Sequence, residues 1–201
     1  LKQWLKIHSE NPVICVPSGN FGNICAGILA HHRGLPVEHF IAACNVNDVV
    51  PEYLRTEILQ PKETVATISN AMDVGDPSNF VRILELFDKE FNQVKNKLSG
   101  YTIDDGETLK TIERVEKDYG YVLDPHGAVA FVALEKYLAE NGGKGFFLET
   151  AHPVKFPDSV EKATGKSVEI PKSLEELMKQ GKFTTEINPQ YEELKEFLLK
   201  K

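Results

Sequence analysis

A buried strand followed by a glycine-containing polar turn and a second apolar segment is the feature that most constrains this chain. Val13–Val16 is a β-branched run typical of a strand, Pro17–Asn23 contains the turn, and Ile24–Ala30 is an apolar, small-residue segment typical of a helix. Glycines in the turn let the backbone approach a ligand closely. The first N–H groups of the helix point into the turn, where the helix dipole also favours negative charge. The pattern therefore predicts a strand–loop–helix unit that binds a phosphate through main-chain amides.

A second apolar run, Val37–Cys44, follows the predicted helix, which ends near Arg33 before the helix-stopping segment Gly34–Pro36. Strand, helix and strand at this spacing indicate a right-handed βαβ crossover. We therefore expect an α/β fold, a three-layer parallel sheet with helices on both faces. Ligands in such sheets bind beyond the carboxyl ends of the strands, where both the Ser18–Asn23 loop and the polar turn Asn45–Asp48 are predicted to lie.

A third strand is predicted at Gly145–Glu149, and Thr150 follows it directly. The rule for parallel sheets places Thr150 at the same edge as the Ser18–Asn23 loop, so we expect both to face one crevice. The segment Thr67–Asn79 is long and polar for a connection, which is typical of a functional or disordered loop.

The rest of the chain is predicted to be largely helical. Helices are expected at 1–8, about 79–91, 106–119, 125–138, 157–164, 173–180 and from 189. Residues 1–10 are expected to end an upstream part of a longer protein, since the chain opens on a helical stretch without a methionine. Residues 11–201 are expected to form one large domain with a helical insertion at about 79–120.

Composition argues against several classes of partner. A net charge of −7 and a pI near 5.4 leave no basic stripe for nucleic acid. No apolar run approaches the length of a membrane span, so no membrane partner is expected. Cys15, Cys25 and Cys44 lie inside apolar segments and are interpreted as buried, reduced thiols of a cytoplasmic protein.

Common catalytic signatures are absent from the sequence. The glycine turn fits neither a P-loop nor the dinucleotide fingerprint, Ser18 lacks the pattern of a nucleophile elbow, and no spacing typical of a metal site occurs. His126 and His152 stand next to prolines and could be catalytic, although histidines near helix starts more often pack or cap.

Five motifs taken together resemble the threonine synthases, pyridoxal-phosphate enzymes with a tryptophan synthase β-like fold. In chain order the matching motifs are Pro17–Asn23, Asn45–Asp48, Ser69–Val74, Asp124–Ala130 and Thr150–Phe156. The resemblance covers nearly the whole chain and corresponds to about the C-terminal half of such an enzyme, so the sheet is expected to be incomplete, with added helices.

The resemblance implies pyridoxal 5′-phosphate as the cofactor and assigns roles to site residues. The residues implied to hold the cofactor phosphate are Gly19, Asn20, Phe21, Gly22 and Asn23. Thr150 matches the residue whose hydroxyl meets the pyridine nitrogen. The residues implied to line the substrate side are Ser69, Asn70, Asp73, His152 and Lys155. The implied reaction converts O-phospho-L-homoserine and water to L-threonine and phosphate, and no metal is implied.

One departure from the family pattern concerns the Schiff-base lysine, which in this family lies upstream of the glycine loop. Only Lys2 and Lys6 precede Gly19, and neither has the family's flanking residues. The chain alone is therefore expected to be inactive and to need the N-terminal half of the same enzyme. Two alternatives remain: a non-catalytic phosphoanion-binding module, which would not need Thr150, and a related pyridoxal-phosphate-dependent serine or threonine dehydratase.

Overall fold

The computed structural model describes residues 1–181 and 183–200. The chain divides into two compact units, Leu1–Val168 and Glu169–Lys201. The first unit contains the sheet and all of the predicted site residues. The second contains two helices, α9 (Lys172–Met178) and α10 (Tyr191–Leu199).

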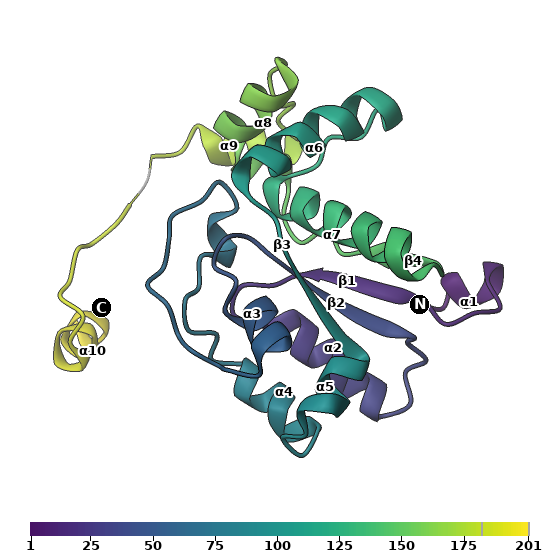
Figure 1. Cartoon of the computed structure of the whole chain (residues 1–201). Helices are drawn as coiled ribbons and strands as arrows, with labels where there is room; N and C mark the ends of the chain where they lie inside the picture. The colour runs from purple at the N-terminus through teal and green to yellow at the C-terminus, as the bar shows by residue number, and fades with distance from the viewer. Residues whose placement is uncertain (182, 201) are drawn as a thin grey trace. The chain divides into compact units, whose positions relative to one another are not determined.

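The first unit is built on a four-stranded parallel sheet with the strand order β3-β2-β1-β4 (Figure 1). The strands are β1 (Val13–Pro17), β2 (His39–Cys44), β3 (Leu98–Thr102) and β4 (Gly145–Phe147). In the register, Cys15 of β1 lies opposite Ile41 of β2 and Phe147 of β4. The carboxyl ends of β1, β2 and β4 therefore open onto one edge of the sheet.

Helices cover both faces of this sheet, as the α/β prediction required. The helices of the first unit are, in chain order, α1 (Trp4–Ile7), α2 (Gly22–His32), α3 (Val49–Thr56), η1 (Asn70–Met72), α4 (Phe80–Leu86), α5 (Phe91–Lys97), α6 (Asp105–Tyr119), α7 (Pro125–Asn141), η2 (Pro153–Lys155) and α8 (Pro157–Thr164). Helix α7 lies on one face, and α2, α3 and α4 lie on the other (Figure 1). None of the helices within the described residues is long and apolar enough to cross a membrane.

The side chains of β1 alternate between two cores. Ile14 and Val16 pack in a cluster with the buried residues of α2 and α4, whereas Val13 and Cys15 pack with the buried residues of α7. Successive residues of a strand point to opposite faces, so an apolar run buries both faces of the sheet. This alternation confirms the three-layer arrangement predicted from the sequence.

The sequence predictions did not include α3, α5, β3 or the short helices η1 and η2, and one predicted helix was too long. Helix α3 was not predicted because Pro51 was interpreted as a helix breaker. Pro51 lies in the first turn of α3, where the backbone N–H that proline lacks would have no partner within the helix. Strand β3 was missed within the segment predicted to be a helical insertion; its Gly100 is required because a Cβ there would lie 2.8 Å from Pro51 Cα. The helix predicted at about 79–91 corresponds to α4, which ends at Leu86. Asp88 and Lys89 then adopt positive φ angles of 53° and 61°, and α5, which begins at Phe91, was not predicted.

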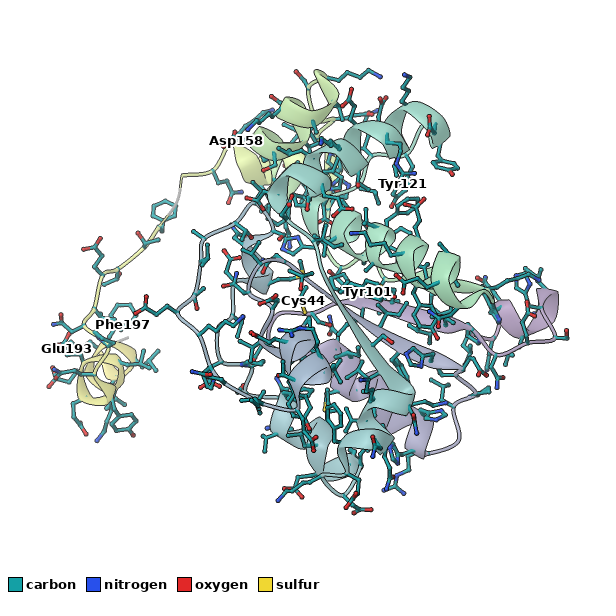
Figure 2. The ribbon with its side chains drawn as sticks, viewed as in Figure 1. Cys44, Tyr101, Tyr121, Asp158, Glu193 and Phe197 are labelled. Carbon is teal, nitrogen blue, oxygen red and sulfur yellow. The ribbon has the colours of Figure 1, made fainter. Side chains whose placement is uncertain are left out.

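The three cysteines are free thiols. Cys15 and Cys44, the latter labelled in Figure 2, are fully buried in the sheet, and burial raises the pKa of both thiols well above the ordinary value. Cys25 on α2 is half-buried, and burial raises its pKa as well. All three thiols therefore stay protonated at neutral pH and are poor nucleophiles.

Candidate functional site

The loop between β1 and α2 is held to the sheet at its first residue. The buried Ser18 donates its N–H to Ala43 O at 2.8 Å and its hydroxyl to Val16 O at 2.8 Å. Both the N–H and the hydroxyl of Ser18 therefore donate to backbone carbonyl groups. It fixes the point from which residues 19–23 leave the strand.

The loop presents a row of free backbone donors. Among the described residues, none accepts a hydrogen bond from the backbone N–H groups of residues 19–24; the first helical bond of α2 runs from Cys25 N–H to Phe21 O at 3.0 Å. Phe21, the residue before α2, has a left-handed backbone with φ 62° and ψ 17°. Consecutive N–H groups around a left-handed residue form a concavity that suits an anion.

The strained backbone of Phe21 is stabilised by its side chain. The ring is 4% exposed and packs edge-on against Phe80 of α4, with 5.6 Å between the ring centroids. A left-handed conformation is unfavourable for a bulky residue and persists only where surrounding packing enforces it. Burial of the ring thereby keeps the neighbouring amides turned outward.

Asn20 contributes to the loop through its main chain. Its Oδ1 accepts hydrogen bonds from Ser78 N at 2.7 Å and Ser78 Oγ at 2.9 Å, and Asn79 Nδ2 donates to Asn20 O at 2.9 Å. The side chain therefore connects the loop to the segment before α4. Its backbone N–H and its Nδ2 have no acceptor among the described residues, so both are free for an anion.

Gly19 is in close contact with a second predicted motif, Ser69–Val74. A Cβ on Gly19 would lie 2.5 Å from Met72 Cα and 3.1 Å from Ala71 O, so only glycine fits here. The turn Asn70–Met72 therefore packs directly on the glycine loop. The structure thus joins two motifs that are far apart in the sequence.

Two residues predicted to face the substrate, Ser69 and Asp73, belong instead to a network behind this turn. The carboxylate of Asp73 accepts hydrogen bonds from Asn45 Nδ2 at 2.8 Å, from Asn47 Nδ2 at 3.2 Å and from Thr67 Oγ1 at 2.7 Å. Ser69 is fully buried, and its Oγ accepts from Asn45 Nδ2 at 3.2 Å. Both side chains therefore support the turn, whereas the Asn70 side chain is exposed and has no partner among the described residues.

Thr150 lies beyond the end of β4, next to the strand that leads into the glycine loop. Leu148 N–H donates to Cys15 O at 3.0 Å, which extends the β1–β4 ladder past Phe147. Thr150 is exposed, and its hydroxyl has no hydrogen-bond partner in the part of the chain that the structure describes. The strand register therefore puts it at the same sheet edge as residues 19–23.

The two remaining substrate-side predictions have different outcomes. His152 Nδ1 accepts a hydrogen bond from Val154 N at 3.1 Å, so this side chain caps η2. Lys155, in η2, is exposed, and its ammonium has no ion-pair partner among residues 1–181 and 183–200. Of this pair, Lys155 is the one with a charge available to a ligand.

A buried cluster that sequence reasoning did not assemble lies behind the site. Asp124 Oδ1 accepts from His126 N at 2.8 Å and from His126 Nδ1 at 2.6 Å, so Asp124 caps the N-terminus of α7. His126 Nε2 accepts from Ala71 N at 3.2 Å. Glu149 Oε1 accepts from Asp124 N at 3.3 Å. The sequence signal for Glu149 was a lone acid at the end of an apolar strand.

The two carboxyl groups of this cluster titrate differently. Burial, a hydrogen bond to Asp124 and its negative charge raise the pKa of Glu149 to about 8. Burial also raises the pKa of Asp124, but hydrogen bonds from His126 and Glu149 outweigh it, so this pKa falls below its ordinary value. At neutral pH Glu149 therefore carries a proton and Asp124 carries the charge.

Comparison with known families gives two overlapping matches. The family described as "Pyridoxal-phosphate dependent enzyme" matches residues 4–146, and the family described as "Threonine synthase, C-terminal" matches residues 127–198. Together they cover the sheet, the glycine loop, α9 and all but the last residue of α10. The resemblance that the five motifs predicted is thereby confirmed.

Curated relatives and solved structures agree with these matches. The chain is 45% identical to a threonine synthase of Buchnera aphidicola subsp. Schizaphis graminum over 96% of its own length and 44% of the relative's. It is 49% identical to the threonine synthase of Escherichia coli K12 over 82% of its length and 38% of that protein.

The solved structure of threonine synthase from Escherichia coli matches with a TM-score of 0.85 and 42% identity, over 95% of this chain and 44% of that one. A structure of pyridoxal-phosphate-bound threonine synthase from Brucella melitensis matches with a TM-score of 0.85 and 29% identity, over 96% and 47%. The chain therefore spans less than half the length of each of these threonine synthases.

Proposed function

Because this chain belongs to the pyridoxal-phosphate dependent enzyme family, we propose that it is the phosphate-binding part of a threonine synthase. The proposed enzyme converts O-phospho-L-homoserine and water to L-threonine and phosphate, with pyridoxal 5′-phosphate as its cofactor. The observation that carries the proposal is the row of N–H groups at residues 19–24, for which the described residues hold no acceptor. A phosphate ester there would accept several charge-assisted hydrogen bonds, each worth about 1.5–3 kcal/mol.

Thr150 is proposed to meet the pyridine nitrogen of the cofactor. Its unpartnered hydroxyl and its position at the edge shared with residues 19–23 support this role. When bound, pyridoxal phosphate acts as an electron sink for a carbanion beside the substrate nitrogen. A neutral hydroxyl can hydrogen-bond the ring nitrogen without supplying the negative charge that would favour its protonation. The chain would thus hold the ring in its less electron-withdrawing form.

Asn70 and Lys155 are proposed to contact the substrate. Each has an exposed side chain without a partner among the described residues. The Lys155 ammonium is a point charge suited to the phosphate of the substrate, and the Asn70 amide can donate and accept hydrogen bonds. Ser69, Asp73 and His152 would act indirectly, by supporting the turn and the η2 segment.

The lysine that binds the cofactor covalently is proposed to lie outside these 201 residues. Lys2 and Lys6 are the only lysines before Gly19, and both are exposed on or next to α1. Incubation with pyridoxal phosphate, borohydride reduction and mass spectrometry should find no stoichiometric lysine adduct. An adduct at one lysine of this chain would contradict the proposal.

Adding back the missing part tests the proposed activity. The N-terminal portion of a threonine synthase, produced separately, should form a complex with this chain that absorbs near the visible edge and releases phosphate from O-phospho-L-homoserine. Neither part alone should do so. A well-formed complex that binds the cofactor but leaves the substrate unchanged would refute the assigned reaction.

The proposed compartment is the cytoplasm. Cys15, Cys25 and Cys44 are free thiols, as expected in a reducing environment.

A further inference from the structure

We propose that His126 is a positioning residue. Asp124 orients its ring, and its Nε2 accepts a hydrogen bond from the N–H of Ala71, which keeps the turn Asn70–Met72 packed against Gly19. The turn's role in ligand binding rests on the proposed function. The placement of the turn by His126 does not.

The ring of His126 has one partner on each nitrogen. Nδ1 lies 2.6 Å from Asp124 Oδ1, and Nε2 lies 3.2 Å from the N atom of Ala71. The side chain is almost completely buried, and the ring of Phe156 lies against it with 4.8 Å between centroids. Water therefore has little access to the hydrogen bond with Asp124, whereas the hydrogen bond with the exposed Ala71 is only partly buried.

These partners define the tautomer of the ring. The N–H of Ala71 can only donate, so Nε2 must carry a lone pair, and the single ring proton lies on Nδ1 and is donated to Asp124. Asp124 is 0% exposed and also accepts from the backbone N–H of His126, which fixes its rotamer. A buried carboxylate that holds an imidazole by Nδ1 orients the acceptor on the other side of the ring.

The contact with Ala71 is transmitted to the glycine loop through the backbone. Ala71 O and Met72 Cα are the atoms that approach the position of a Cβ on Gly19. Both atoms belong to the short helical turn η1, in which the N–H of Ala71 donates a hydrogen bond to His126. If that hydrogen bond is lost, the turn can lift from the loop and the amides of residues 19–23 lose a packing partner.

Glu149 links the same cluster to Thr150. Its Oε1 accepts the N–H of Asp124 at 3.3 Å, and Thr150 is the next residue in the chain. The other carboxyl oxygens of the pair, Asp124 Oδ2 and Glu149 Oε2, are buried and have no hydrogen-bond partner among the described residues, so a proton shared by the pair would leave it with one negative charge. The cluster thereby connects the loop of residues 19–23, which is proposed to bind the phosphate, with Thr150, which is proposed to contact the pyridine ring.

Two variants separate the two hydrogen bonds of His126. Asparagine at this position reaches as far as Nδ1 and can donate to Asp124, but it is too short to reach Ala71. Glutamine places an acceptor near the position of Nε2. His39→Gln is the matched control, because His39 is also buried, lies on β2, stacks on Tyr137 and bonds Ser99 Oγ at 2.9 Å.

Amide hydrogen exchange of Ala71 and Met72 in the full chain is the primary readout. His126→Asn should speed exchange of the Ala71 amide about tenfold or more, His126→Gln should restore most of the protection, and His39→Gln should leave it unchanged. Nitrogen-15 spectra of the His126 ring should show a proton on Nδ1 and a bare Nε2. Thermal melting checks that each variant folds.

Binding of pyridoxal 5′-phosphate is the second readout. His126→Asn should weaken it about fivefold or more, and His126→Gln should do so less. The inference is overturned if His126→Asn leaves Ala71 exchange unchanged, or if His39→Gln alters it equally. If the wild-type chain binds no phosphate compound, the proposed function fails, while the exchange experiment still decides the role of His126.

Discussion

Substitution of Gly19 by alanine should damage the phosphate site and the fold together. The new Cβ would lie 2.5 Å from Met72 Cα, 3.0 Å from Met72 C and 3.1 Å from Ala71 O. Carbon atoms in contact normally lie about 3.5–4.0 Å apart, so the two segments must separate by about 1 Å. All three neighbouring atoms are backbone, so no side-chain rotation relieves the overlap.

The expected loss of stability follows from this overlap. Overpacking of this kind costs about 1–3 kcal/mol, which for a chain of this size lowers Tm by about 2–4 °C per kcal/mol. Displacement of one amide from the phosphate would remove a charge-assisted hydrogen bond worth about 1.5–3 kcal/mol, a loss of about 10- to 150-fold in affinity. Both effects should appear in Gly19→Ala.

Gly22→Ala is the matched control within the same loop. Its Cβ would lie 3.7 Å from Asn79 Nδ2, an ordinary contact, and the residue is already in the first turn of α2. Stability should be unchanged or increase by up to about 1 kcal/mol. Differential scanning calorimetry and titration calorimetry with pyridoxal 5′-phosphate measure both variants. Equal behaviour of Gly19→Ala and Gly22→Ala would refute the packing argument.

Three further substitutions test other parts of the account. Thr150→Val should weaken pyridoxal 5′-phosphate about fivefold in equilibrium titrations but leave inorganic phosphate unaffected; equal losses would contradict a contact with the ring. Asp73→Asn should lower the free energy of unfolding in urea by about 2–3 kcal/mol, because the carboxylate accepts from Asn45, Asn47 and Thr67; an unchanged midpoint would count against the network. Glu149→Gln should remove a pH dependence of stability: its pKa rises from 4.5 to about 8 on folding, so its contribution is complete below pH 4.5 and is lost as pH rises through 8. Because Glu149 is half-buried and solvent screens its charge, this contribution is on the order of 2 kcal/mol. If the difference between the urea midpoints of the wild type and Glu149→Gln stays constant from pH 5 to 8, this explanation is wrong.

The central part of the fold was predictable from local pattern. The apolar runs that became β1 and β2, the glycine loop and the helix stop before Val37 specify a βαβ unit without reference to other segments. Strand β3 was not predictable in this way, because Leu98–Thr102 is only partly apolar and its glycine is explained by packing against Pro51. Tertiary contact, not local propensity, determines that strand.

The candidate site also has a part that local sequence pattern predicts and a part that depends on tertiary contacts. The free amides of the loop and the placement of Thr150 follow from strand order and the rule for carboxyl ends. The capping of η2 by His152 and the burial of Ser69 depend on side-chain partners that no spacing reveals. The cluster around His126 joins residues separated by 55 positions in the chain, as in the hydrogen bond from Ala71. Such pairs are visible only in the folded structure.

An NMR titration of the chain with pyridoxal 5′-phosphate, and in parallel with pyridoxal, shows whether the loop of residues 19–23 binds the phosphate group. The backbone N–H resonances of residues 19–23 should shift with the phosphate ester and not with pyridoxal, since these amides are free donors in the structure. Shifts confined to other parts of the chain, or identical shifts with both compounds, would contradict the assignment of this loop as the phosphate site.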